Sequence, residues 1–283
     1  METIEQHLES IKKSMRQKIE NSPVAMEAKE LAKSPLELTK YRNERNLMLY
    51  PFCSTSKRKR LKTIEYKSSD AKRWLQVTAN HEFGMAKIWD FDVLRFALSK
   101  AGEIAMSLGY FPASIEFTAY ECLKGIGRNT KGMASYAWLE KALQRLLGTT
   151  YRGNIFRDNE KIVDGFKLIS FQYLKKEDGT IEGMKISFDE RLIESVRYNK
   201  GLLAIDAEVL HEESGIKKRL LELIKVSKGN DKEWTVGLER LAAMCAHDGS
   251  LKRFKFELKS YQLPWKIKFS KKINGKDNVI FFD

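Results

Sequence analysis

The chain of 283 residues has little cysteine, proline or glycine, and it has no long apolar run. Its 3 cysteines lie far apart and form neither a CxxC pair nor a zinc-binding set, so a disulfide scaffold and a zinc module are excluded. With 5 prolines and 17 glycines, it is not a fibrous or low-complexity protein. The first residues lack a basic start and an apolar core. We therefore expect a cytoplasmic protein without a signal peptide or a membrane span.

The residue patterns that accompany catalysis are also missing. The 4 histidines form no metal-binding pair, which argues against a nicking enzyme. Residues 125–132 are glycine-rich but lack P-loop spacing, and Glu257 and Lys259 match only half of a nuclease motif. Asp90 and Asp92 are paired carboxylates, but Asp90 is expected to cap a helix. We predict no catalytic residue, no metal and no cofactor, and a tyrosine nicking enzyme is the least favoured alternative.

Positive charge is what the chain has in excess. It holds 51 Lys and Arg against 38 Asp and Glu, a net charge of +13, which favours a polyanionic partner such as nucleic acid. Residues 57–73 carry 8 basic and 2 acidic side chains, a net charge of +6. Residues 250–276 carry 9 basic and 1 acidic side chain, a net charge of +8. Such concentration predicts two binding surfaces. The first surface includes the basic run Lys57, Arg58, Lys59 and Arg60.

The N-terminal part predicts a helix and a connector. From Thr3 to Asn21, apolar residues recur every three or four positions, which indicates an amphipathic helix that needs a partner surface. That surface is either its own domain or a second copy of the chain. Residues 21–44 are polar, contain two prolines, and are predicted to form a connector.

The rest of the chain predicts one order of elements twice. We expect short strands at 46–50 and 61–66 and, after them, a helix, a short strand, two helices and a β-rich segment. Gly109 ends the first helix, and Thr118 with Glu121 forms a capping box. The first set covers 90–109, 114–117, 119–126, 133–147, 149–156, 165–174 and 181–188. The second set covers 214–225, 231–236, 238–245, 251–261, 265–269 and 278–282, with Ser250 as a cap and Asn274-Gly275 as a hairpin turn.

This order is that of a winged helix, in which the helix before the hairpin reads DNA. We predict an α+β chain with an N-terminal helical segment and connector (1–44) and two tandem winged-helix domains (45–200 and 201–283). Both recognition helices bury an apolar face. The predicted DNA-facing side of the first helix holds Lys131, Trp138, Lys141 and Arg145. The second helix and its wing supply Lys252, Lys255, Phe256, Lys259, Lys266, Lys268, Lys271, Lys272 and Lys276.

Several segments, in this order, resemble the replication initiator protein A family of plasmids. They begin with RNLMLYPF from Arg45, SKRKRLKTIEY from Ser56 and FTAYECL from Phe117. The longest is YAWLEKALQRLLGTT from Tyr136. The later ones are GFKLIS from Gly165, KKRLLEL from Lys217, WTVGLERL from Trp234 and LKRFKFEL from Leu251. The resemblance covers residues 45–283.

The resemblance implies two winged helices that bind direct repeats (iterons) in double-stranded DNA at a plasmid origin. The origin then opens, and the host initiator and replicative helicase are recruited. Dimers of such proteins often repress their own promoter, and here a homodimer would form through residues 1–20 or the first winged helix. Carried onto this chain, the hairpin after the first recognition helix supplies Tyr151, Arg152 and Asn154, and the second helix adds Arg253. A winged-helix transcriptional repressor without origin activity is the main alternative.

Overall fold

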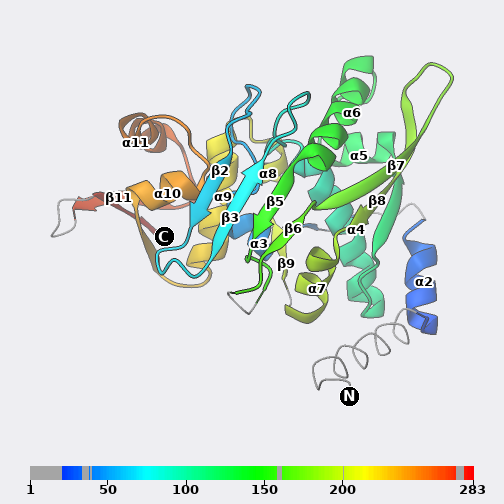
Figure 1. Ribbon diagram of the computed structural model, residues 1–283, viewed down its shortest axis with the longest axis horizontal. Coiled ribbons are helices and arrows are strands. Elements are labelled where there is room, and N and C mark those ends of the chain that lie inside the picture. Colours follow the sequence, from blue (N-terminus) through cyan, green and yellow to red (C-terminus); the bar gives the residue numbers. More distant parts are fainter. Residues whose placement is uncertain (1–20, 34–37, 39, 158–160, 200, 272–276) are drawn as a thin grey trace.

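The computed structural model describes residues 21–33, 38, 40–157, 161–199, 201–271 and 277–283. It is a mixed structure of helices and antiparallel sheets, as the predicted α+β class requires (Figure 1). The amphipathic helix predicted from Thr3 to Asn21 lies almost wholly outside the described residues. Among those residues, no helix is long and apolar enough to span a membrane.

The first repeated set is built around α4, a helix whose residues are buried along most of its length. The helix ends where Gly109 takes a left-handed conformation (φ 69°), which a glycine adopts without a Cβ clash. Thr118 and Glu121 form the predicted capping box at the start of the next helix. The elements are α4 (Phe91–Leu108), β4 (Ser114–Thr118), α5 (Ala119–Gly125), α6 (Met133–Gly148), β7 (Ile169–Lys175) and β8 (Ile181–Phe188). Their strands form a sheet of order β4-β8-β7.

The second set repeats this arrangement near the C-terminus. A five-residue strand again runs directly into a seven-residue helix, and the turn after that helix again contains a left-handed residue, Ala246 in place of Gly127. Ser250 caps the next helix as predicted. The elements are α9 (Gly215–Lys228), β10 (Glu233–Gly237), α10 (Leu238–Met244), α11 (Leu251–Ser260), β11 (Lys266–Lys271) and β12 (Asp277–Phe282). The sheet order is β10-β12-β11.

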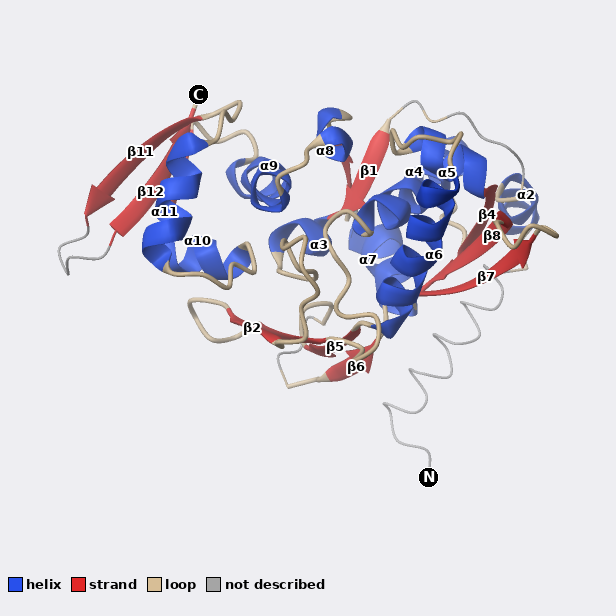
Figure 2. Cartoon of the chain, turned by 90° about the horizontal axis from the view of Figure 1, so that it is seen from above, coloured by secondary structure: helices blue, strands red, loops and turns tan. Residues whose placement is uncertain are grey.

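The chain also forms a third sheet, which the sequence did not predict. Two of its strands precede α4, and two lie between α6 and β7. It has the order β2-β3-β5-β6 and consists of β2 (Ile64–Lys67), β3 (Trp74–Thr78), β5 (Thr150–Gly153) and β6 (Asp164–Phe166). In Figure 2 it lies apart from the β4-β8-β7 sheet. The prediction that β5 belongs to the hairpin after α6 is therefore wrong, because β5 pairs with β3 and β6.

The remaining elements correct two predictions. They also pair a strand near residue 41 with a strand near residue 205. The predicted connector contains α2 (Pro23–Leu31) and β1 (Tyr41–Glu44), and the strand expected at 46–50 is helix α3 (Arg45–Leu49). After α7 (Glu190–Asn199), β9 (Leu202–Ile205) pairs antiparallel with β1, and α8 (Glu208–His211) leads into α9. The β1-β9 pair crosses the predicted boundary at 200/201, and the division into 45–200 and 201–283 stays a prediction.

Candidate nucleic-acid interface

Helix α6 turns two alanines, a methionine and a lysine to solvent. Leu139, Leu143 and Leu146 are buried on its inner side, as predicted. Met133 is 61% exposed, and the other outward residues are Ala134, Ala137 and Lys141. Lys141, a predicted DNA-contacting residue, is exposed on this side of the helix. Lys131, just before the helix, is also exposed.

Arg145 does not lie on that outward side. Its guanidinium is buried against Asp90, with Nε–Oδ2 and Nη2–Oδ1 distances of 2.7 Å. Asp90 also accepts a hydrogen bond from the Lys87 backbone and makes no side-chain cap on α4. The prediction for Arg145 is corrected, because it ties α6 to the start of α4. Asp90 stands at the N-cap position as predicted, but its carboxylate bonds to Arg145 and makes no cap hydrogen bond.

Trp138 is half-buried and lies beneath Arg128. The Arg128 guanidinium carbon is 3.3 Å from the centre of the Trp138 ring, a cation–π contact. Arg128 follows Gly127, whose φ of +71° shapes the turn between α5 and α6. Sequence patterns did not indicate Arg128, because a cation ten residues before a tryptophan leaves no periodic signal. This contact brings a cation next to the outward side of α6.

An ion pair ties each of the two predicted recognition helices to the hairpin that follows it. In the first set, Glu140 accepts from Lys175 and from the Tyr173 hydroxyl, both at 2.9 Å. These two hydrogen bonds hold the pKa of Glu140 below its usual value. In the second set, Lys255 lies 2.5 Å from Asp277 and lowers the pKa of that carboxyl in the same way. Each hairpin is thus positioned beside the helix it follows.

Helix α11 presents the more strongly basic surface. Phe254 and Leu258 are fully buried, and Lys252, Arg253 and Lys259 are exposed, as predicted. Arg253 also pairs with Glu257 on the next turn, at 2.8 Å. In the hairpin, the exposed lysines are Lys266, Lys268 and Lys271, whereas Lys272 and Lys276 lie outside the described residues.

The predicted basic run lies in the loop before β2, which Figure 1 shows between α11 and α6. Lys57, Arg58 and Lys59 are exposed. Arg60 instead donates to the Ala246 carbonyl oxygen at 2.6 Å, in the turn that precedes α11. The first three residues therefore extend a basic surface between the two helices, while the fourth anchors the loop.

Two residues carried over from the family resemblance are buried. Tyr151 packs against Phe52 and Phe166 in the third sheet. Asn154 donates to the Lys72 carbonyl and accepts from the Trp74 backbone. Both are corrected to structural roles, because β5 belongs to the β2-β3-β5-β6 sheet. Arg152 is exposed on that sheet and lies 5.8 Å above the Trp74 ring.

The structure adds a groove that the sequence did not predict. It has a volume of about 1230 Å³ and lies between β2, the start of α10 and the β11-β12 hairpin. Its cationic lining comes from segments far apart in the sequence, which is why no local pattern indicates it. The lining includes Lys67, Arg240, Lys252, Lys255 and Lys271. Arg240 links the two sides by donating to the Ser69 hydroxyl at 2.9 Å.

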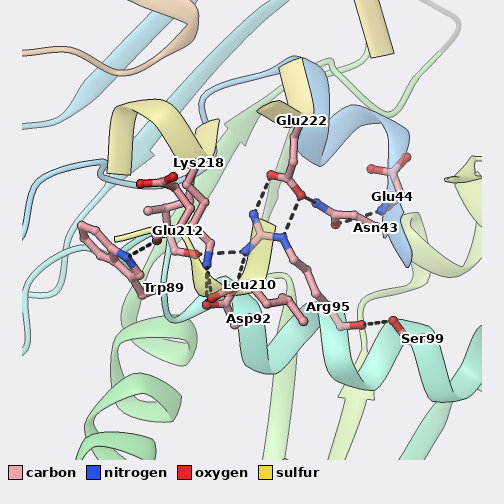
Figure 3. A network of polar contacts seen from close by, with 11 residues as sticks. Asn43, Glu44, Trp89, Asp92, Arg95, Ser99, Leu210, Glu212, Lys218 and Glu222 are labelled. Carbon is pink, nitrogen blue, oxygen red and sulfur yellow. Dashed lines mark hydrogen bonds and ion pairs between the residues drawn. The ribbon is translucent and has the colours of Figure 1, made fainter. Parts of the chain in front are cut away.

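A buried polar network fixes the two repeated sets to each other (Figure 3). Arg95 of α4 meets Glu222 of α9 through two hydrogen bonds, and Lys218 of α9 reaches Asp92 of α4 at 2.7 Å. Asn43 of β1 donates to Glu222 at 2.7 Å. All five side chains are buried. The network therefore fixes α4 against α9, the first helices of the two repeated sets.

Among the described residues, no group of three or more histidine, cysteine, aspartate or glutamate side chains is placed to hold a metal ion. The charged side chains that line the groove are mostly cations, together with the carboxylates of Glu239 and Asp277.

Comparison with known sequences decides the family. The replication initiator protein A profile matches residues 42–263, which is most of the chain. The chain belongs to the replication initiator protein A family. A protein of Wigglesworthia glossinidia brevipalpis described as "Putative replication protein" is 29% identical over 233 residues, covering 79% of this chain and 81% of that protein. The resemblance inferred from the sequence segments is confirmed.

Two crystal structures of domains 2 and 3 of RctB are similar to this replication initiator A family member. Their TM-scores are 0.56 and 0.51, at 11% and 10% sequence identity. Each comparison covers 84% of this chain and 95% of the RctB chain. At such low identity the likeness concerns the fold alone.

Proposed function

We propose that this initiator binds repeated duplex sites at a plasmid origin through two winged helices. The observation that carries the proposal is the repeated pairing of an outward-facing helix with a hairpin tied to it by an ion pair, Glu140 with Lys175 and Lys255 with Asp277. In a winged helix, the helix enters the major groove and the hairpin lies along the backbone. The basic loop at 57–59 and the lysines of β11 then contact phosphates.

The buried network between α4 and α9 supports simultaneous binding by both units. Two helices that read one face of a duplex must be spaced to match its turn of roughly 34 Å, and a fixed spacing selects sites of matching spacing. Origin opening, recruitment of host initiator and helicase, and a homodimer through residues 1–20 or the first unit belong to the same proposal. Family membership supports them as a group.

The test is maintenance of a marker circle that has no other origin and carries the gene with its upstream DNA. The intact gene is expected to support maintenance. A Lys141→Ala, Lys259→Ala double variant is expected to lose it at equal protein level, because each substitution removes an exposed cation from one outward side. Maintenance by the double variant would contradict the proposal.

Two further measurements separate the alternatives. A repressor without origin activity would leave the circle unmaintained with either gene but would silence a reporter fused to the upstream DNA. A nicking enzyme would convert a supercoiled circle to the relaxed form when a divalent metal is added. Either result would replace the initiator proposal.

A further inference from the structure

Phe256 lies at the centre of the outward side of α11. Its side chain is 74% exposed, whereas Phe254 and Leu258, on the opposite side of the same helix, are fully buried. Successive residues of a helix are 100° apart, so a position two residues from each of these buried side chains points away from the core. The ring therefore adds nothing to the core.

Lysines lie before and after Phe256 along α11, and the ring itself is exposed. Lys255 turns to Asp277 and lies 5.2 Å from the Phe269 ring, toward the hairpin. Lys252 and Lys259 are exposed one turn away on either side, and the Lys259 ammonium lies 5.4 Å from the same Phe269 ring. An exposed apolar ring between lysines of one helix matches a polyanion that offers one apolar group.

Phe256 and Lys141 occupy equivalent positions in the two repeated sets. In α6 the residue tied to the hairpin is Glu140, and Lys141 follows it. In α11 the residue tied to the hairpin is Lys255, and Phe256 follows it. The first unit therefore presents a cation, and the second an aromatic ring, at the same place.

We propose that Phe256 contacts the C5-methyl group of a thymine in the major groove, so that the second unit selects a T·A pair. This inference rests on the proposed function. The thymine methyl is the apolar group among the base edges of the major groove, and phenylalanine is among the side chains that contact it. Lys141 selects guanine or binds phosphate at the corresponding place of the first half-site.

The test replaces thymine by deoxyuridine, which removes the methyl group and keeps every hydrogen-bonding group. The probe is a duplex that the intact protein selects from a random-sequence pool, substituted one thymine at a time. At one position in the second half-site, affinity is expected to fall about fourfold, the effect of one buried methylene-sized group. The Phe256→Ala variant is expected to bind the original duplex roughly five- to tenfold more weakly. It should not respond to deoxyuridine at that position.

Met26→Ala is the matched control, since Met26 is 60% exposed on α2, away from both outward helix sides. It should leave affinity and the deoxyuridine response unchanged. Equal losses on deoxyuridine for the intact protein and Phe256→Ala, or none at any thymine, would overturn the methyl contact while leaving the initiator function standing. Loss of DNA bending in Phe256→Ala without a deoxyuridine effect would overturn it in favour of a wedge between base pairs. Failure to select any sequence would instead contradict the proposed function.

Discussion

Arg95 of α4 and Glu222 of α9 form a two-hydrogen-bond ion pair in the interior, with Nε–Oε1 and Nη2–Oε2 distances of 2.8 and 2.6 Å. The two residues are 127 positions apart in the sequence and come from the first helices of the two repeated sets. Asp92 and Lys218 extend the pair on one side, and Asn43 extends it on the other. This relationship joins the two repeated sets through their first helices.

Glu222→Ala is expected to lower the free energy of unfolding by about 3–5 kcal/mol, because it leaves the Arg95 charge buried without its main partner. The measurement is denaturant unfolding of the intact chain. Asp206→Ala, which removes the exposed partner of Lys225 on the same α9 helix, serves as the control and should cost much less. Equal losses in the two variants would contradict the role assigned to the buried pair.

The contribution of Glu222 should disappear in acid. Burial acts to raise the pKa of Glu222, but the Arg95 charge and hydrogen bonds outweigh it and hold the pKa below its ordinary value of 4.5. A depressed folded-state pKa gives stabilisation that is present above pH 4.5 and is lost as pH falls through the folded-state value. The stability difference between the wild type and Glu222→Gln should therefore be constant near neutral pH and shrink below pH 4.5. A difference that grows on acidification would contradict this sign.

Arg145 and Lys141, one turn apart on α6, should behave in opposite ways. Arg145→Leu is expected to reduce stability by several kcal/mol, because it leaves the Asp90 carboxylate buried without its partner. Lys141→Ala should leave the melting temperature unchanged and weaken duplex binding. Thermal unfolding and DNA titration of both variants check this. An Arg145→Leu variant as stable as the wild type would contradict the structural role assigned to Arg145.

The loop at 57–59 should contribute through salt-dependent phosphate contacts. Replacing Lys57, Arg58 and Lys59 with alanine is expected to flatten the slope of log K against log salt by about 0.9 for each phosphate that the variant no longer binds. The preference between specific and random duplexes should change little. Arg60 is left intact, since its bond to Ala246 holds the loop. An unchanged slope would remove the loop from the interface.

Lys255 and Lys259 should also differ. Lys259→Ala removes an exposed cation that lies 5.4 Å from the Phe269 ring, so it should weaken binding at one half of the repeat and affect the hairpin less than loss of an ion pair does. Lys255→Ala breaks the pair with Asp277, so it should weaken binding and also increase protease cleavage in the β11-β12 hairpin. If Asp277→Asn is cleaved in the hairpin as readily as Lys255→Ala, the increased cleavage results from loss of the Lys255–Asp277 ion pair. Equal sensitivity in Lys259→Ala would contradict it.

Local sequence signals predicted the repeated part of the fold well. The capping box at Thr118, the left-handed Gly109 and the cap at Ser250 depend on residues within a few positions of each other, and all three occur in the structure. The order of helix, strand, helix, helix and hairpin followed from these helix starts and stops. The buried side of α6 followed from helical periodicity.

The errors concern partners that are distant in the sequence. Arg145 is charged, so periodicity assigned it to solvent, and only Asp90, 55 positions away, explains its burial. Tyr151 follows α6 directly, but its strand pairs with β3, which precedes α4. The groove beside Arg240 combines segments from both ends of the chain. No pattern within one segment carries such information.

Binding of both units to regularly repeated duplex sites can be measured by footprinting on the DNA upstream of the gene across a salt series. We expect protection of several regularly spaced direct repeats, with log K falling by about 0.9 per phosphate contact for each unit of log salt. Protection of a single inverted repeat, or no specific protection at any salt concentration, would contradict repeat binding by the two units.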